Sequence, residues 1–277
     1  MYRLLALDID GTLVNSQNEL TAATRAAVLR AKDAGVEVVL ATGRRYSRVL
    51  PLVEPLRMHV PLVTASGALI KDPVDHRTLF RASFGPGVLP DLLSVLTDGG
   101  HDPVLYADTY AHGFDYYCPR IDVEQPELAE FYSMNAGCER VYPDLLSNPP
   151  EGIFGGFAMG KREAMVVLQR ELERLLPDKL LVHVLRSPRY KGFMCEIAPA
   201  GVSKWSGVLH LADEWGIRPA EICAVGDDVN DIPMIRAAGL GVAMGNALDE
   251  VKAAADRVAP CHDSDGLVEV VNWVLDG

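Results

Sequence analysis

The chain of 277 residues has a hydrophobic content of 49% and a formal net charge of −12 at pH 7. This composition indicates a folded globular protein with one large core or two modest ones, and it excludes a disordered chain. The acidity argues against nucleic acid or an anionic membrane as the main partner. No apolar run approaches the roughly 18 residues of a transmembrane helix, and the amino terminus does not resemble a signal peptide. We therefore expect no membrane partner.

Five cysteines lie scattered along the chain without a Cys-x-x-Cys pair: Cys118, Cys138, Cys195, Cys223 and Cys261. An odd, scattered set favours reduced thiols in a cytoplasm over a disulfide framework or a zinc site. We expect these thiols to act as small apolar fillers.

The first third of the chain alternates short apolar runs with helical patterns. Residues 3–8 predict a strand and residues 21–35 a helix, with Thr21 as the N-cap and Gly35 in the left-handed position after the end. The next predicted elements are a strand, a proline-interrupted helix and a strand, at 36–43, near 46–56 and at 60–67. Near-continuous apolar strands separated by helices are typical of a parallel sheet covered on both faces.

The pattern changes over residues 83–194, which predict an inserted α+β domain with its own small core. The clearest segments there are a hairpin, a long Pro- and Gly-rich connection and an amphipathic helix, at 103–117, 142–157 and 161–176. The earlier alternation then returns, with helices near 203–215, 231–239, 247–255 and after Gly266, and apolar runs at 222–227 and 241–245. We predict an α/β fold with a Rossmann-like, doubly wound parallel sheet formed by 1–82 and 195–277 and the inserted domain at 83–194.

Several strands of this predicted sheet end in small or polar residues, among them Asp8, Thr42, Ser66 and Asp227. In an open parallel sheet, ligands bind outside the carboxyl ends of the strands, so side chains far apart in sequence can meet there. A carboxylate just beyond a buried strand, such as Asp8, needs a cation or hydrogen-bond donors to offset its desolvation. These strand ends therefore predict a site.

Acidic residues gather at two of the strand ends, Asp8 with Asp10 and Asp227 with Asp228 and Asp231. Oxygen ligands without His or paired Cys suit a hard cation, and Mg²⁺ is the natural candidate. The alternative is structural: Asp10-Gly11 forms a turn, and Asp8 accepts a hydrogen bond from a backbone amide. An EF-hand fits poorly, because the spacing differs and a strand precedes the acids.

The same region holds groups that an anion needs. Thr12 and Thr42 supply hydroxyls, while Gly11 and Gly43 let backbone amides approach closely. Lys204 opens a helix near the predicted carboxyl edge, where it can meet a phosphoryl group. Each has an ordinary interpretation as well: a cap for Thr42, a solvated surface residue for Lys204, and an exposed basic pair for Arg44 and Arg45.

Four segments in this order resemble the motifs of the haloacid dehalogenase superfamily of phosphohydrolases: DIDGT at 8–12, ATGR at 41–44, GVSK at 201–204 and GDDVND at 226–231. The insertion between the second and third motifs, together with VAMGNA at 242–247 and DGL at 265–267, is similar to the Cof-like sugar-phosphate phosphatases. The resemblance covers the core, and the inserted domain matches that branch's cap domain in position, length and general α/β character.

This resemblance implies an aspartyl-phosphate mechanism with Mg²⁺ as cofactor. Asp8 would be the nucleophile, and Asp10 would protonate the leaving oxygen and then activate water. Thr42 would hold a phosphoryl oxygen, and Lys204 would neutralise charge between Asp8 and the phosphoryl group. The implied metal ligands are Asp8, the backbone carbonyl of Asp10, Asp227 and, in the coordination shell, Asp231. The implied phosphate- or substrate-binding residues are Gly11, Thr12, Gly43, Arg44, Ser66 and Asn230.

Two positions depart from the usual pattern of these relatives. Ser66-Gly67-Ala68 stands where Asn-Gly-Ala is common, so contacts to the phosphate are expected to be rearranged. Trp205 stands where a glycine is usual, and it either packs in the core or narrows the entrance. Substrate selection is expected from the cap, with candidate contacts to the leaving group at Tyr110, His112, Arg186, Arg189, Tyr190 and Lys191.

The leading hypothesis is a Mg²⁺-dependent phosphatase of small phosphorylated metabolites such as sugar phosphates, acting as a monomer or homodimer. A sugar-phosphate phosphomutase is an alternative that needs a second phosphate cluster in the cap, where Arg186, Arg189 and Lys191 are the candidates. A non-catalytic metabolite-binding regulator is a further alternative, and the intact acids and Lys204 argue against it. P-type ATPases share the chemistry but have membrane helices and the motif DKTGT.

Overall fold

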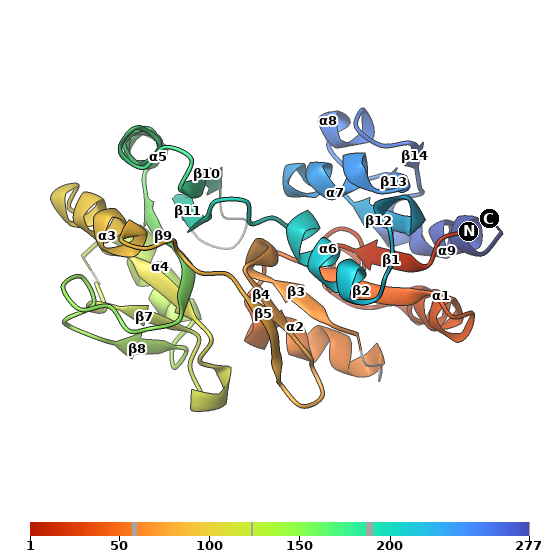
Figure 1. The fold of residues 1–277 in the computed structure, drawn as a ribbon, viewed down its shortest axis with the longest axis horizontal. Helices are drawn as coiled ribbons and strands as arrows, with labels where there is room; N and C mark the ends of the chain where they lie inside the picture. The colour runs from red at the N-terminus through yellow and green to blue at the C-terminus, as the bar shows by residue number, and fades with distance from the viewer. Residues whose placement is uncertain (57–59, 123, 187–190, 277) are drawn as a thin grey trace. The chain divides into compact units, whose positions relative to one another are not determined.

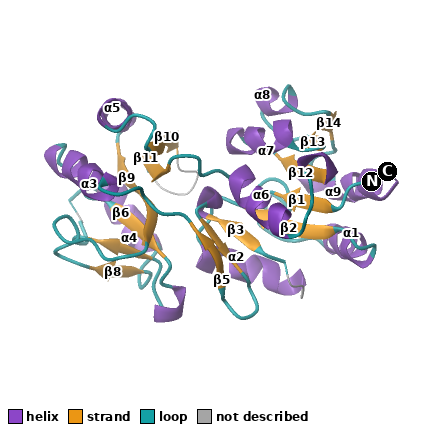
Figure 2. Ribbon diagram, in the orientation of Figure 1, coloured by secondary structure: helices purple, strands orange, loops and turns teal. Residues whose placement is uncertain are grey.

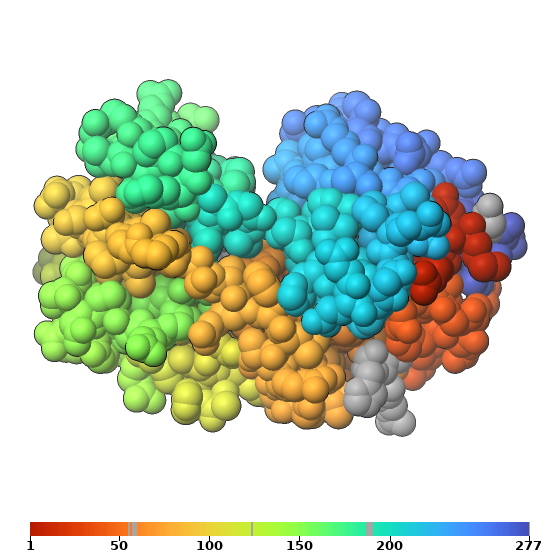
Figure 3. All heavy atoms as spheres, in the orientation of Figure 1, coloured from red at the N-terminus to blue at the C-terminus, as the bar shows by residue number. Residues whose placement is uncertain are grey.

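The structure is a computed structural model that describes residues 1–56, 60–122, 124–186 and 191–276. The described chain divides into two compact units, the first formed by 1–80 with 203–277 and the second by 81–202. Figure 3 shows how the two segments of the first unit join, with red to orange atoms directly beside cyan to blue ones.

A sheet of eight strands forms the centre of the first unit in the described part of the chain (Figure 1). In spatial order the strands are β14 (Arg257–Val258), β13 (Leu240–Ala243), β12 (Ile222–Gly226), β1 (Leu4–Leu7), β2 (Glu37–Ala41), β3 (Leu62–Thr64), β4 (Leu69–Lys71) and β5 (Thr78–Arg81). The strands from β14 to β3 run parallel, whereas β4 pairs antiparallel with β3. The predicted parallel core is confirmed. The antiparallel β4 was not predicted, because the chain reverses in a short 3₁₀ turn at Ala65–Gly67.

Helices flank this sheet, as the purple ribbons of Figure 2 show. They are α1 (Ala22–Asp33), α2 (Tyr46–Val53), α6 (Lys204–Glu214), α7 (Ile232–Ala237), α8 (Asp249–Lys252) and α9 (Leu267–Asp276). α1 begins and ends as its sequence predicts, since Thr21 accepts a hydrogen bond from the Thr24 amide and Gly35 adopts a φ of 84°. α8 is shorter than predicted, and Pro51 lies inside α2.

The core fixes the position of β1 from both sides. Leu4 and Ala6 pack in a cluster with residues of α6, and Trp205 lies against the same cluster. Leu5 and Leu7 point to the opposite face and are also fully buried. Trp205 therefore contributes to core packing, which is one of its two predicted roles. Because β1 is buried on both faces, the backbone position of Asp8, the residue that follows Leu7, is fixed.

The second unit has its own sheet, with strands in the spatial order β10 (Leu180–Arg186), β11 (Phe193–Pro199), β9 (Ile153–Gly160), β6 (Val104–Ala107), β7 (Tyr116–Cys118) and β8 (Glu139–Val141). Helices α3 (Val88–Asp98) and α5 (Arg162–Leu175) pack against one hydrophobic cluster, and α4 (Pro126–Met134) packs against another. The predicted hairpin is confirmed, because β6 and β7 pair antiparallel, and α5 confirms the predicted amphipathic helix.

One prediction for the second unit is wrong, and another, the domain boundary, stays a prediction. Residues 142–157 are not one long connection, because Ile153 begins the fully buried strand β9. The glycines that suggested a loop are there for packing: a Cβ on Gly156 would lie 2.4 Å from the carbonyl oxygen of Val104. The division into compact units falls after Val202, because β11 pairs with β10 along its length and with β9 from Phe193 to Ile197. The domain boundaries themselves stay a prediction.

All five cysteines are free, and Cys118, Cys195 and Cys223 are buried among apolar side chains, as predicted. Among the described residues, no helix combines the length and the apolar character that crossing a bilayer requires.

Candidate active site

The predicted site residues of the first unit follow directly on strand ends. Asp8 comes after β1, Thr42 after β2 and Asp227 after β12. Leu7, the last residue of β1, lies level with Leu40 of β2 and Val225 of β12 in the parallel register. The strand ends are therefore side by side, and the side chains that follow them are brought together as the sequence predicted.

Lys204, Asp8 and Asp231 form a buried ion-pair cluster. Nζ of Lys204 donates to Asp8 Oδ1 at 2.6 Å, to Asp231 Oδ1 at 2.7 Å and to Asn230 Oδ1 at 3.1 Å. The Lys204, Asp8 and Asp231 side chains are at most 4% exposed. Lys204 is thus no solvated surface residue. It reaches the acids because Ser203 caps α6 and makes Lys204 its first residue.

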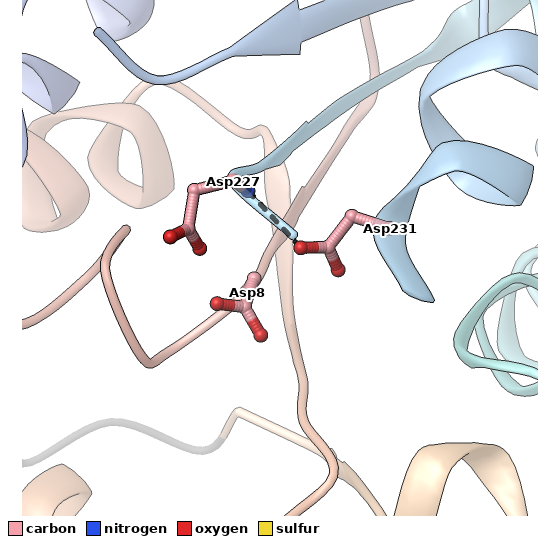
Figure 4. Close-up of side chains that lie close together, drawn as sticks. All are labelled: Asp8, Asp227 and Asp231. Carbon is pink, nitrogen blue, oxygen red and sulfur yellow. Dashed lines mark hydrogen bonds between the residues drawn. The ribbon is translucent and has the colours of Figure 1, made fainter. Parts of the chain in front are cut away.

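Asp227 completes a cluster of three acids. One oxygen of Asp8, of Asp227 and of Asp231 lies within 4.8 Å of the other two, and Figure 4 shows the three side chains converging. Asp231 Oδ2 also accepts the backbone N–H of Asp227 at 3.0 Å, the dashed line in Figure 4, and that of Asp228 at 3.1 Å. Both oxygens of Asp231 therefore have protein partners, and the loop after β12 is folded around this side chain.

The electrostatics of the cluster are unbalanced. Burial raises the pKa of Asp8 well above its usual value, and Lys204 offsets this only in part because Asp231 and Asp227 raise it further. Burial and the charge of Asp231 raise the pKa of Asp227 to about 7. Burial alone would lower the pKa of Lys204, but the charges of Asp231 and Asp8 outweigh it and raise this pKa above its usual value. Lys204 is therefore a cation, yet three carboxylates face one ammonium group.

This imbalance and the all-oxygen donor set fit a hard divalent cation. A second positive charge would favour ionised Asp8 and Asp227 and lower the pKa of both. Mg²⁺ takes oxygen ligands and is commonly held by one or two carboxylates. The residues present therefore match the ion that the sequence predicted.

Asp10 lies in a different environment from Asp8. Its side chain is 54% exposed and accepts two hydrogen bonds from Arg44, one from Nε to Oδ2 at 2.7 Å and one from a terminal nitrogen to Oδ1. The same terminal nitrogen of Arg44 donates to Asn18 Oδ1. Arg44 therefore does not belong to an exposed basic pair with Arg45, because its side chain is only 11% exposed and forms an ion pair with Asp10.

Ser66, Gly43 and Asn230 line one small region beside the acids. A Cβ placed on Gly43 would lie 3.4 Å from Ser66 Oγ and 4.0 Å from Asn230 Nδ2. The backbone N–H of Ser66 donates to the carbonyl of Thr42 at 3.0 Å, and Ser66 has a left-handed φ of 55°. The Thr42 hydroxyl accepts the Arg44 amide at 3.1 Å. The structure thus groups these predicted phosphate-binding positions.

Gly11 and Thr12 contact Asp227. Gly11 has a φ of 75°, and a Cβ there would lie 2.2 Å from Asp227 Oδ2, so only glycine fits this approach. Thr12 is buried, and its hydroxyl lies 3.5 Å from Asp227 Oδ1. The turn after β1 therefore packs directly on the acid after β12.

The candidate substrate contacts of the predicted cap belong to the second unit. Arg186 ends β10 and is exposed, Lys191 donates its backbone N–H to Glu130, and Tyr110 and His112 lie in a 3₁₀ turn. Arg189 and Tyr190 lie outside the described residues. Their proposed role in substrate selection stays a prediction.

Sequence reasoning missed two asparagines that contact site residues. Asn18 accepts from Arg44, and Asn246 donates to Asp227 Oδ2 at 3.2 Å. A signal for Asn246 was present, since the apolar run at 241–245 is followed by a polar residue like the other strand ends. No local pattern distinguishes Asn18.

A family model described as haloacid dehalogenase-like hydrolase matches residues 5–271. Among curated proteins, the Bacillus subtilis phosphatase YwpJ is 29% identical, with 99% of this chain and 100% of that protein covered. The 5-amino-6-(5-phospho-D-ribitylamino)uracil phosphatase YcsE, also of Bacillus subtilis, is 28% identical, with 99% of this chain and 96% of that protein covered.

Solved structures are similar over the whole chain as well. A haloacid dehalogenase-like hydrolase from Bacteroides thetaiotaomicron superposes with a TM-score of 0.79 at 28% identity, covering 99% of this chain and 100% of that one. The similarity includes both units, so the inserted second unit is a shared feature and no peculiarity of this chain.

Proposed function

Since this chain belongs to the haloacid dehalogenase-like hydrolase family and its relatives YwpJ and YcsE are phosphatases, it is a phosphatase, and we propose that it hydrolyses small phosphate monoesters through an aspartyl-phosphate on Asp8. The observation that carries this proposal is the buried Asp8 carboxylate, bonded to Lys204 within a cluster of acids at the carboxyl ends of β1 and β12. A carboxylate held in one orientation and removed from water is a suitable nucleophile.

In the first step an oxygen of Asp8 attacks phosphorus and the bond from phosphorus to the ester oxygen breaks. The leaving oxygen takes a proton from Asp10, which yields an alcohol and an aspartyl-phosphate. In the second step Asp10 takes a proton from water as that water attacks phosphorus. The acyl phosphate bond breaks, and inorganic phosphate leaves with the Asp8 carboxylate restored. Asp10 suits this role because it is exposed enough to exchange protons.

The remaining core residues position and neutralise the phosphoryl group, which is the main requirement of phosphoryl transfer. Lys204 neutralises charge between Asp8 and the phosphoryl oxygens. Thr42, Ser66 and Asn230, with the amides around Gly11, Thr12 and Gly43, hold those oxygens. Arg44 orients Asp10, as its two hydrogen bonds to that carboxylate suggest.

We propose Mg²⁺ as the cofactor, held by Asp8, Asp227 and the Asp10 carbonyl, with Asp231 in support. When bound, the ion supplies positive charge to the phosphoryl oxygens and to the attacking carboxylate. The unbalanced acid cluster described above supports this assignment.

The substrate class we propose is sugar phosphates or related phosphorylated metabolites. The name of one relative supports it, because a phospho-D-ribityl group is a phosphorylated sugar alcohol chain. We place the reaction in a cytoplasm, where the five free thiols would stay reduced. Either a monomer or a homodimer is compatible with this proposal.

A panel of phosphate monoesters, assayed for released phosphate with Mg²⁺ and with a chelator, tests the function. We expect hydrolysis of a subset of the panel, lost with the chelator and lost in Asp8→Asn. Product analysis with hexose 1-phosphates is part of the assay, since isomerised sugar phosphate in place of released phosphate would overturn hydrolysis in favour of a mutase. No turnover with any ester, together with tight binding of one, would contradict catalysis.

A further inference from the structure

The turn after β13 is joined to the loop that carries Asp227 by two backbone hydrogen bonds. The backbone N–H of Met244 donates to the Gly226 carbonyl at 3.0 Å, and that of Leu248 donates to the Asp227 carbonyl at 3.3 Å. In the sequence, Asn246 lies midway between Met244 and Leu248, the donors of these two hydrogen bonds. Its side chain is thereby held over the contact between the loop after β12 and the turn after β1.

The side-chain amide of Asn246 makes three hydrogen bonds to three different segments. Nδ2 donates to the Gly11 carbonyl at 2.8 Å and to Asp227 Oδ2 at 3.2 Å. Oδ1 accepts the backbone N–H of His262 at 3.0 Å. The reverse amide orientation would place Oδ1 against two acceptors and Nδ2 against a donor, so the neighbours determine the orientation.

The sequence around Asn246 explains how the third segment comes so close. A Cβ on Gly245 would lie 2.8 Å from the Cys261 nitrogen and 2.9 Å from the Ala259 carbonyl oxygen, so a side chain there would push residues 259–262 away. With glycine at 245 the two segments touch, and the Gly245 N–H donates to the Pro260 carbonyl at 3.3 Å. This close packing brings the His262 N–H within hydrogen-bond distance of Asn246 Oδ1.

We propose that Asn246 is a positioning residue that fixes the Asp227 carboxylate against the turn after β1, at Gly11. The inference rests on the proposed function in one respect, since it takes Asp227 to be a Mg²⁺ ligand. Asn246 joins three parts of the site: Asp227, the Gly11 carbonyl and the segment at His262. Without this amide, Asp227 Oδ2 loses a donor, and the carboxylate is held less firmly, through the longer contact of the Thr12 hydroxyl with Oδ1. Partners that orient metal-binding side chains in this way control metal affinity.

Asn246→Ala tests this role by calorimetric titration of the substrate-free protein with Mg²⁺. We expect binding weaker by roughly 10–100-fold, the usual effect of losing such a partner. Asn272→Ala is the matched control, because that exposed asparagine accepts from Arg30 on the surface and should leave the affinity unchanged. Far-UV circular dichroism establishes that each variant is folded. A folded Asn246→Ala with the affinity of the wild type would overturn the proposal.

A second pair of variants removes only the bond that orients the amide. His262→Pro deletes the N–H donor, and Cys261, with φ −61° and ψ 149°, already has the backbone that precedes proline. His262 is also the first residue of a 3₁₀ turn, where proline is tolerated. We expect about fivefold weaker Mg²⁺ binding in His262→Pro, the effect of one hydrogen bond, and no change in His262→Ala, which keeps the N–H.

Amide hydrogen exchange without metal gives a readout that does not depend on Mg²⁺. Exchange in peptides covering residues 8–14 and 226–228 should be faster in Asn246→Ala and His262→Pro than in the wild type and His262→Ala. Equal rates in all four proteins would overturn the positioning role. A wild type that binds no Mg²⁺ would contradict the proposed function instead, and the exchange rates would still decide the role of Asn246.

Discussion

The two aspartates of the DIDGT segment differ in their surroundings although they are two residues apart. Asp8 is 3% exposed and is bonded to Lys204, whereas the side chain of Asp10 is 54% exposed and is held by Arg44. A nucleophile must be fixed at the reacting atom, and a proton carrier must reach water. The two environments suit the two proposed roles.

A double-mutant cycle tests whether Arg44 acts through Asp10. Arg44→Ala should lower kcat by about 10²-fold, because the Asp10 carboxylate is misplaced when its two bonds are lost. In the Asp10→Asn background, Arg44→Ala should have almost no further effect on kcat. Arg45→Ala, which loses the same charge at the next position, serves as the control. If the losses multiply in the double variant, Arg44 acts on the substrate directly.

At this scale the sequence predicts which side chains meet, but not how each is held. Asp8, Thr42, Lys204 and Asp227 follow strand ends or begin a helix, and that placement is readable from apolar patterns. The bond from Asn246 to Gly11 joins residues 235 positions apart, and it depends on a turn geometry that no local pattern encodes.

Among the elements, the start of α6 depends on the short turn after β3. Gly67 has a φ of 102°, and a Cβ there would lie 2.0 Å from the Ser203 carbonyl oxygen. Ser203 caps α6, whose first residue is Lys204. The turn that carries Ser66 and the helix that carries Lys204 are therefore packed together through this glycine.

Gly67→Ala should destabilise the first unit more than Gly35→Ala does. Both glycines have positive φ, but a Cβ on Gly35 meets nothing within 4 Å, so Gly35→Ala costs only about 1–2 kcal/mol of backbone strain. The clash at Gly67 should add roughly 1–3 kcal/mol. Urea unfolding followed by tryptophan fluorescence measures this, since Trp205, Trp215 and Trp273 all lie in the first unit. Equal losses in the two variants would show that the contact with Ser203 is not tight.

The sequence predicts helices and strands best where the buried residues of an element follow one regular apolar pattern. β1, β2, β12, α1 and α5 follow from apolar periodicity and caps, because each pattern matches one kind of surface. β9 was missed because Gly155 and Gly156, which indicate a loop locally, are required by close packing between neighbouring strands. β4 was missed because the chain reverses at Ala65–Gly67, inside the run 60–67 that the apolar pattern predicts as one strand.

For the whole molecule, the acid cluster gives stability a specific pH dependence. The pKa of Asp227 is about 7 in the folded protein, far above the value of 3.8 for the unfolded chain, and that of Asp8 is raised as well. Between these values the folded state binds more protons than the unfolded state, so the free energy of unfolding falls as the pH rises.

Without Mg²⁺, the free energy of unfolding should therefore fall between about pH 5 and pH 7, by up to about 1.4 kcal/mol per pH unit for each such group. Asp227→Asn should have a smaller slope, because one of the two raised groups is gone. Saturating Mg²⁺ should flatten the wild-type slope, since the ion lowers both pKa values. Urea unfolding at several pH values, followed by tryptophan fluorescence, measures all three. Identical slopes in wild type and Asp227→Asn would contradict the raised pKa of Asp227.

The central claim is that Asp8 carries the phosphoryl group during turnover. The direct measurement is a rapid acid quench of the enzyme during hydrolysis of a phosphate ester with a labelled phosphoryl group, followed by peptide mapping. The account predicts label on the peptide that contains Asp8, released as phosphate on longer incubation, and neither label nor turnover in Asp8→Asn. Turnover by Asp8→Asn at the wild-type rate, or label on a different residue, would contradict it.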